Sequence, residues 1–320
     1  MIQRYFTIVG LLLLTSCYHS PQMKGPGPGN THSSLKAFTV LESLPTLNVY
    51  TADNSAVNVS YASERAKLFG ITAAAVDTGK VYRASSGDLE VQVDKVSGAT
   101  FFQDRHRMWG ADDQPFTTPL SDDEAEALAV NYIAARRLAK RSELHFFQVN
   151  RLKRVSSVTN VQETMEVEVV FKRKLHGRLV HGAGSQLSLF IGSDKQVRGV
   201  FLDWPDLKKQ HEVPLRDSRK AAGDLKKALD EVNKRFKGEI KVKGFDVKTT
   251  RLEYAGRISP DGKRTVYPVY TLEGIKHIGD KQEVDVLVVP ATDDLHLPSP
   301  TVGTSLPTQL PGPTPQEIEN

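Results

Sequence analysis

The chain has 320 residues, of which 42 are basic and 38 acidic, and its formal net charge is +4. An excess this small excludes a broad nucleic-acid-binding surface. The hydrophobic content of 39% is ordinary for a globular protein, and the length leaves room for two or three domains. The single cysteine, Cys17, has no second cysteine with which to form a disulfide within the chain.

The N-terminus has the three parts of a secretory signal peptide. Arg4 precedes an apolar run over residues 5–14, and Leu14-Thr15-Ser16-Cys17 follows. The apolar run is shorter than the roughly 20 residues that cross a bilayer. The last four residues resemble the lipobox of bacterial lipoproteins. The resemblance implies that residues 1–16 are removed and that Cys17 carries the lipid.

Lipid on Cys17 would anchor the protein in the bacterial cell envelope and leave no free thiol for catalysis or metal binding. Tyr18 follows the cysteine, in place of the Asp associated with inner-membrane retention, so we expect the outer membrane. The alternative is a plain secreted protein with an incidental cysteine near its cleavage site.

Two low-complexity segments flank the rest of the chain. Residues 17–34 contain Gly25-Pro26-Gly27-Pro28-Gly29 and predict a flexible tether. Residues 292–320 are rich in proline and predict a disordered tail. The folded part should therefore lie between these segments.

Residues 35–110 predict an N-terminal α+β unit. Ser63 to Phe69 favours a short helix, and three short strand patterns follow between Val81 and Asp104. Lys95-Val96-Ser97-Gly98 predicts a hairpin turn between the last two strands.

Residues 111–212 carry the clearest pattern. Ser121-Asp122-Asp123-Glu124 is typical of a capping box, and apolar residues then recur at helical spacing to Ile133. Strand patterns follow over 144–158, 164–171, 186–191 and 196–202, and Trp204-Pro205 ends the unit. The arrangement predicts one helix packed on an antiparallel meander.

Residues 213–291 predict a similar unit. Asp217 or Ser218 could cap a helix that ends near Gly238. Strand patterns cover 239–254, 265–272 and 283–289. We therefore expect an α+β fold of two to three repeated units, each with one helix on an antiparallel β-meander.

The middle and third units resemble PepSY-type domains and the propeptides of thermolysin-like proteases. The likeness depends on the strands that flank Gly177 and Gly182, and it extends at most over residues 35–291. It implies inhibitory or binding modules of the envelope, with no catalytic residues to carry over. No protease domain follows in this chain, which excludes a propeptide role in cis.

Basic residues occur in short runs, and solvated faces explain most of them. The alternative is attraction to an anionic membrane surface or an acidic partner. The runs include Arg136-Arg137, Lys140-Arg141 and Lys172-Arg173-Lys174.

Four residues are candidates for a binding surface. His176 and His181 flank a predicted turn and could approach one metal ion, but exposed turn histidines are the simpler interpretation. Asp203 and Trp204 could hold a sugar or peptide, although a tryptophan packed at the end of a strand is favoured. We predict no metal and no cofactor.

Other polar clusters have structural explanations. His106 lies in a charged loop beside Trp109, and the acids at 122–124 suit helix capping. Asp112-Asp113 lacks the oxygen spacing of a calcium loop. No nucleophile elbow or phosphate-binding glycine loop is present in the sequence.

The sequence thus predicts a non-catalytic envelope lipoprotein that binds a protein or peptide partner, with an inhibitory or regulatory role as one form. An extended segment could add to an exposed sheet edge. The alternatives are an envelope hydrolase whose site forms only in three dimensions, and a structural spacer of an envelope assembly. A nucleic-acid partner is not expected.

Overall fold

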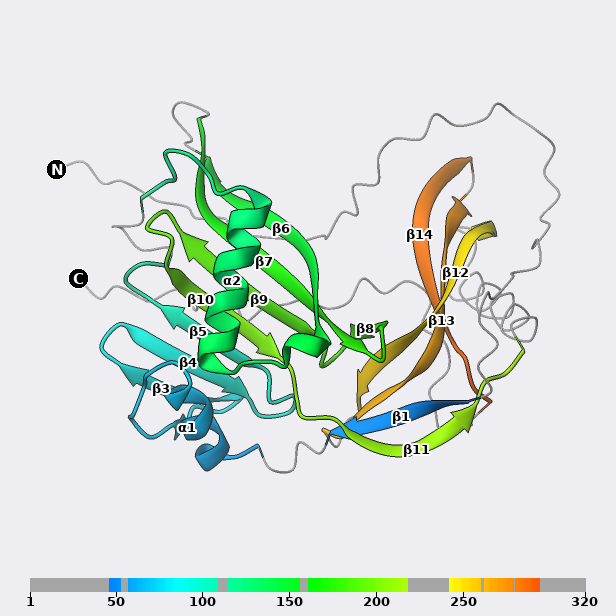
Figure 1. Ribbon diagram of the computed structural model, residues 1–320, viewed down its shortest axis with the longest axis horizontal. Coiled ribbons are helices and arrows are strands. Elements are labelled where there is room, and N and C mark those ends of the chain that lie inside the picture. The colour runs from blue at the N-terminus through cyan, green and yellow to red at the C-terminus, as the bar shows by residue number, and fades with distance from the viewer. Residues whose placement is uncertain are drawn as a thin grey trace.

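The computed structural model describes residues 46–52, 57–108, 114–155, 161–217, 242–259, 262–278 and 280–293. Their strands connect into one 14-stranded mixed sheet that is divided between two lobes (Figure 1). The predicted signal peptide, Cys17 and the tether lie outside the described residues, as do Trp109, Asp112-Asp113 and most of the predicted tail.

The first lobe is an antiparallel sheet with both α-helices on one face (Figure 1). Its strand order is β6-β7-β9-β10-β5-β4-β3-β2. The elements are α1 (Val59–Lys67), β2 (Val76–Asp77), β3 (Val81–Ser86), β4 (Leu89–Asp94), β5 (Thr100–Asp104), α2 (Asp122–Arg136), the 3-10 helix η1 (Arg141–Glu143), β6 (Leu144–Val155), β7 (Gln162–Leu175), β9 (Gln186–Gly192) and β10 (Val197–Asp203).

The second lobe combines an early strand with late ones. β1 (Thr46–Ala52) pairs with both β11 (Lys208–Pro214) and β13 (Arg264–Ile278). β12 (Val242–Ile258) and β14 (Lys281–Pro290) also pair with β13, and all these pairs are antiparallel. The chain of the first lobe is therefore inserted between β1 and β11.

One short strand connects the lobes. β8 (Arg178–Gly182) leaves β7 through a two-residue turn, His176-Gly177, in which both residues have positive φ. This turn matches the twist of a hairpin. β8 then pairs in parallel with β12, from Val180 opposite Tyr254 to Gly182 opposite Gly256.

Local sequence chemistry explains α2. Ser121 Oγ accepts a hydrogen bond from the Glu124 amide, and the Glu124 carboxylate accepts one from the Ser121 amide. The predicted capping box is thus confirmed. Ala125, Ala129 and Ile133 form the buried stripe, because residues four apart share one face of a helix.

The cores of the two lobes differ. The first lobe has one continuous cluster in which the helices pack on alternate residues of the strands, including Leu187, Leu189 and Ile191. The second lobe has three small clusters, one of which centres on Tyr254 and Val266. Burial in the first lobe is therefore concentrated under its helices.

The predicted fold class is wrong. The strands do not form two or three separate helix-and-meander units, because the edges of neighbouring groups pair with each other. β5 pairs with β10, and β8 pairs with β12, so one sheet extends through the described residues. Those residues contain two α-helices, and the helix expected after Asp217 falls on residues that the structure does not describe.

Candidate binding cleft

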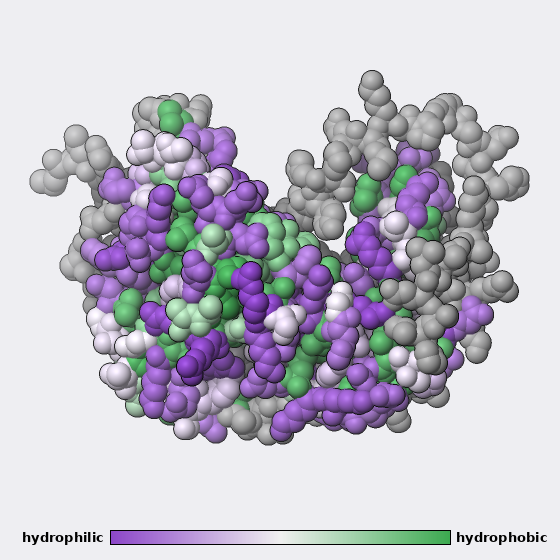
Figure 2. Space-filling view, in the orientation of Figure 1, coloured by the Kyte–Doolittle hydropathy of each residue, from purple (hydrophilic) through white to green (hydrophobic). Residues whose placement is uncertain are grey.

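A cleft of about 440 Å³ opens at the C-terminal end of α2. We call it the α2 cleft. It lies where the connection from α2 to β6 passes the strand ends, and Figure 2 shows hydrophobic surface beside α2 with hydrophilic residues around it. Its lining consists of Arg65, Val130, Ile133, Ala134, Arg137, Leu138, Ala139, Lys140, Arg141, Glu143, Leu144, Arg173, Trp204 and Asp206.

The end of α2 places one arginine at the cleft in an unusual backbone conformation. Arg137 has φ +53°, and its amide donates to the carbonyl of Ala134, while the Leu138 amide donates to Ile133. Glycine is the usual residue at such a left-handed helix end, because a side chain there costs on the order of 1 kcal/mol. The Arg137 side chain is nevertheless exposed and lines the cleft.

A second arginine is fixed in the wall of the cleft. Arg173 is buried and stacks over Trp204, with its guanidinium carbon 4.6 Å from the ring centroid. It forms an ion pair with Glu143 at 3.0 Å and donates to the carbonyl of Pro205 at 2.8 Å. Burial lowers the pKa of Arg173 to about 10, so this group stays protonated at neutral pH.

The cleft carries excess positive charge. Five of its lining residues are basic and two are acidic, and one acid, Glu143, is already paired with Arg173. The carbonyl end of α2 contributes roughly half a negative charge, which one cation offsets. Arg137 and Arg141 are exposed and make no side-chain hydrogen bond or ion pair with any residue that the structure describes. The arrangement suits an anionic group.

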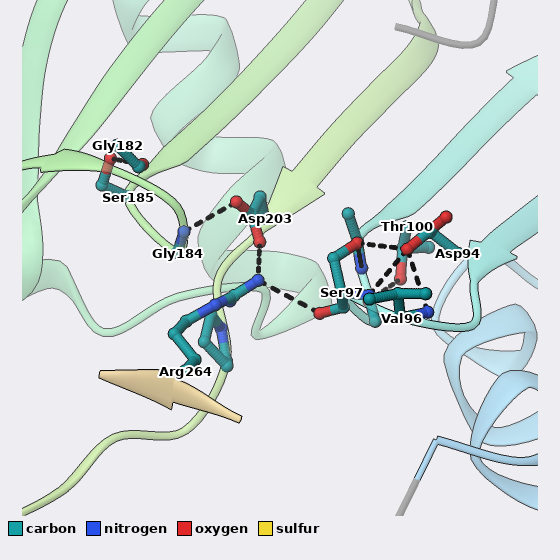
Figure 3. Close-up of polar contacts among 12 residues, drawn as sticks. Asp94, Val96, Ser97, Thr100, Gly182, Gly184, Ser185, Asp203 and Arg264 are labelled. Carbon is teal, nitrogen blue, oxygen red and sulfur yellow. Dashed lines mark hydrogen bonds and ion pairs between the residues drawn. The ribbon is translucent and has the colours of Figure 1, made fainter. Parts of the chain in front are cut away.

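Trp204 and Asp203, both predicted as binding residues, have different surroundings. Trp204 is 6% exposed and packs in the core of the first lobe, where it also forms part of the cleft wall. Asp203 accepts a hydrogen bond from the Gly184 amide at 2.7 Å and forms an ion pair with Arg264 at 2.8 Å (Figure 3).

Asp203 belongs to a closed seam between the lobes. Arg264, from β13, is fully buried and also donates to the carbonyl of Ser97 in the first lobe at 3.1 Å (Figure 3). The space left beside these residues is about 10 Å³, which holds one water molecule at most. The contacts of Asp203 are therefore those of a structural link.

The two predicted histidines lie near the seam but face different partners. His176 stacks with Tyr50 of β1, with ring centroids 6.3 Å apart. The Nε2 atom of His181 lies 2.5 Å from a carboxylate oxygen of Glu253. Burial raises the pKa of Glu253, but the hydrogen bond and charge of His181, with smaller contributions from Thr271 and Arg251, together outweigh burial, and the net pKa is lowered.

The other polar residues considered in the sequence, the acids at 122–124 and His106, lie away from the cleft. Asp122 forms an ion pair with Arg151 at 2.7 Å, and Glu124 is the capping residue of α2. His106 is exposed and lies outside the α2 cleft. Among the described residues, no three His, Cys, Asp or Glu side chains converge on a possible metal position.

The main residues of the cleft were visible in the sequence only as basic runs. Arg137, Arg141 and Arg173 lie in three of those runs, for which solvated faces were the favoured explanation. The end of α2, η1 and β7 bring these three arginines together. The sequence feature that could have indicated the cleft is the position of two basic runs just beyond the predicted helix.

None of the described helices is long and apolar enough to cross a membrane.

Comparison with known proteins finds no matching family model and no similar curated protein. Among solved structures, the chain is similar to an uncharacterised protein from Eubacterium rectale, with 12% identity, a TM-score of 0.38, and coverage of 78% of this chain and 84% of that one. It is also similar to the C-terminal domain of YpeB from Bacillus megaterium, with 12% identity, a TM-score of 0.33, and coverage of 74% and 94%. Both TM-scores lie below 0.5, so function has to be argued from the residues of this chain.

Proposed function

We propose that this protein is a non-catalytic, lipid-anchored binding protein of the bacterial envelope. In this proposal the α2 cleft receives an anionic group of a peptide or protein partner. The observation that carries it is the cleft itself, with aliphatic residues next to Arg137 and Arg141 and with Arg173 fixed on Trp204. Concave sites that combine an apolar lining with a few placed polar groups are typical of ligand binding.

The composition of the lining supports binding over catalysis. It contains aliphatic, basic and acidic residues and one tryptophan, and no serine, threonine, cysteine or histidine. The hydrolase alternative needs histidines and acids to gather in a cleft, and His106, His176 and His181 all lie outside this lining. The pattern-level resemblance to PepSY-type modules agrees with a binding role.

The cleft can be tested by its own tryptophan. The chain has two tryptophans, so Trp109→Phe leaves Trp204 as the single reporter. We expect saturable changes in Trp204 fluorescence with a peptide that alternates Glu and Leu, and none with its Lys and Leu counterpart. Because the cleft carries positive charge, like charges in the ligand are repelled.

A matched pair of variants provides the control. Ala134 and Ala135 are both exposed near the end of α2, but only Ala134 lines the cleft. Ala134→Glu should weaken binding of the acidic peptide at least about tenfold, whereas Ala135→Glu should leave it nearly unchanged. Equal effects of the two variants, or no saturable signal with the acidic peptide, would contradict the proposal.

The anchor has its own test. Cells that express the protein should incorporate labelled palmitate into it, and Cys17→Ala should abolish the label, because Cys17 is the only thiol in the chain. Label retained in the Cys17→Ala variant would contradict lipidation at this residue.

A second binding mode is favoured by β14. Within the described residues this strand pairs on one side only, and its register with β13 is regular. Val284 and Val286 are exposed on it, the former to 69%. Charges and prolines normally protect such edges from strand addition. β11 carries Lys208, Lys209 and Pro214 in this role, and β14 has charges only in its first half, at Lys281, Glu283 and Asp285, while residues 286–289 are uncharged.

Strand addition at β14 makes a separate prediction. Val284→Lys combined with Val286→Lys should prevent a partner from pairing there, because charges disfavour a new strand at an edge. The acidic peptide should still change Trp204 fluorescence in this variant. Loss of partner binding in the Ala134→Glu variant alone would assign the partner to the cleft.

A further inference from the structure

We infer that the ligand of the α2 cleft is the C-terminal residue of a peptide, with a free carboxylate and an aliphatic side chain. This inference rests on the proposed function and specifies its ligand. It follows from the distribution of apolar and basic groups in the cleft, from the position of Arg137, and from the volume available.

Apolar and basic groups alternate over short distances along the lining. Val130 and Ala134, one turn apart on α2, and Leu144 present accessible aliphatic surface, while Ile133 and Leu138 lie buried beneath them at the base of the cleft. Arg137 directly precedes Leu138, and Arg141 lies three residues before Leu144. A ligand that fills this cleft must present an aliphatic group and a negative charge close together.

The C-terminal residue of a peptide meets this requirement. Its side chain and its carboxylate are attached to the same Cα atom, so both can be satisfied within one residue. An internal Asp or Glu instead carries its charge at the end of a side chain and has backbone amides on both sides. Placing those amides against aliphatic residues without hydrogen bonds would cost several kcal/mol.

The basic groups also suit a terminal carboxylate. A guanidinium donates two parallel hydrogen bonds to the two oxygens of one carboxylate. Arg137 and Arg141 are free of described partners, whereas Arg173 is occupied by Glu143 and by the Pro205 carbonyl. Arg137 has a strained, left-handed backbone conformation, and its side chain lines the site. Such strained residues are often found at binding sites.

The volume suits a short segment. A cleft of about 440 Å³ lies within the range of about 300–1,000 Å³ that is typical of small-ligand sites. That space accommodates one or two terminal residues, and the rest of the peptide would extend into solvent. A partner protein with an accessible C-terminus fits this geometry.

Four peptides and one fatty acid separate the possible ligands, and the binding of each is measured by Trp204 fluorescence in the Trp109→Phe background. The first is an acetylated Gly-Ser-Gly-Leu peptide with a free carboxylate, and the second is the same peptide with a C-terminal amide. The third ends in Ser with a free carboxylate. The fourth is an amidated peptide with an internal Glu, and decanoate serves as a fatty-acid comparison.

The free acid that ends in Leu should bind at least about tenfold more tightly than its amide, because charge-assisted hydrogen bonds are lost in the amide. It should also bind more tightly than the Ser-terminated acid, since the aliphatic contact is then missing. Arg137→Gln combined with Arg141→Gln should remove the preference for the acid. The paired control, Lys208→Gln with Arg257→Gln, removes two exposed charges from the second lobe and should preserve the preference.

The outcomes distinguish this inference from the function on which it rests. Tighter binding of the internal-Glu peptide than of the Leu-terminated acid would overturn the C-terminal assignment while leaving an anion-binding cleft. Equal binding of the acid and its uncharged amide would overturn both, because the negative charge would then contribute nothing. Tighter binding of decanoate than of every peptide would overturn it in favour of a fatty acid. No response to any anionic probe would overturn the proposed function as well.

Discussion

The two lobes use the same β-structure in different ways. In the first lobe, α1 and α2 cover one face of an antiparallel sheet, and a single core joins them to the strands. In the second lobe, β12 and β13 form a long ribbon with 17 and 15 residues, and its buried residues divide into three clusters. The contrast suggests that the first lobe is stabilised mainly by its own core and the second more by its junction with the first.

Substitution of Arg264, which links the two lobes, should cause the largest loss in the free energy of unfolding. Arg264→Met removes the buried partner of Asp203, and breaking a buried ion pair from one side typically costs about 3–5 kcal/mol. Denaturant unfolding should show this loss, and the second lobe should unfold before Trp204 reports unfolding of the first. The control is Arg251→Met, which removes an exposed ion pair with Glu273 and should cost about 1 kcal/mol or less.

Gly256 tests the junction through the backbone. A Cβ atom at this position would lie 1.9 Å from the carbonyl oxygen of Ala183, so β8 and β12 would have to separate. Gly256→Ala should therefore lower the free energy of unfolding by about 1–3 kcal/mol. Gly199→Ala in β10 meets the flexible end of Met108 instead and should cost less. A larger loss for Gly199→Ala would contradict the special role of the junction.

The pair of His181 and Glu253 predicts a pH dependence. Since the pKa of Glu253 in the folded protein is lowered from 4.5, its contribution to stability is complete above that pH and is lost as the pH falls through the lowered value. Glu253→Gln should therefore reduce the loss of stability between neutral pH and pH values below about 4.5. Unfolding curves measured across this pH range test the prediction. If the Glu253→Gln variant lost as much stability at low pH as the unchanged protein, Glu253 would not be the group responsible.

The smallest expected effect lies in the first lobe, far from the junction. Ser121→Ala removes the N-cap of α2 and should cost about 1 kcal/mol in the free energy of unfolding. Ser142→Ala, at an exposed position in η1, should have little effect. If both lobes lost stability equally in the Ser121→Ala variant, they would unfold as one cooperative unit.

Local patterns predicted the elements of the first lobe well. The helix after Ser121 follows from its capping box and apolar spacing, and the predicted turn at Gly98 has its amide bonded to Asp94. In the second lobe the Gly262 amide donates a short-range hydrogen bond to the Ser259 carbonyl. These features depend on contacts between residues that are close in the sequence.

The arrangement of the sheet could not be predicted in the same way. Parallel pairing of β8 with β12 joins segments far apart in the sequence, and no periodicity encodes which edges meet. The sequence does not predict β11, because the residues from Lys208 to Glu212 are all polar and show no alternation with apolar residues. The α2 cleft was missed for a related reason, since Arg173 reaches it from β7 and Arg137 from the end of α2.

The insertion of the first lobe between β1 and β11 has a kinetic consequence. Thr46 of β1 and Glu212 of β11 form a hydrogen bond although they are 166 residues apart. Closing so long a loop is slow, because conformational entropy is lost before the contact forms. If the intervening residues fold first, they bring the two strands near each other and shorten the effective loop. The β1–β11 pair should therefore be among the last contacts to form when the protein folds.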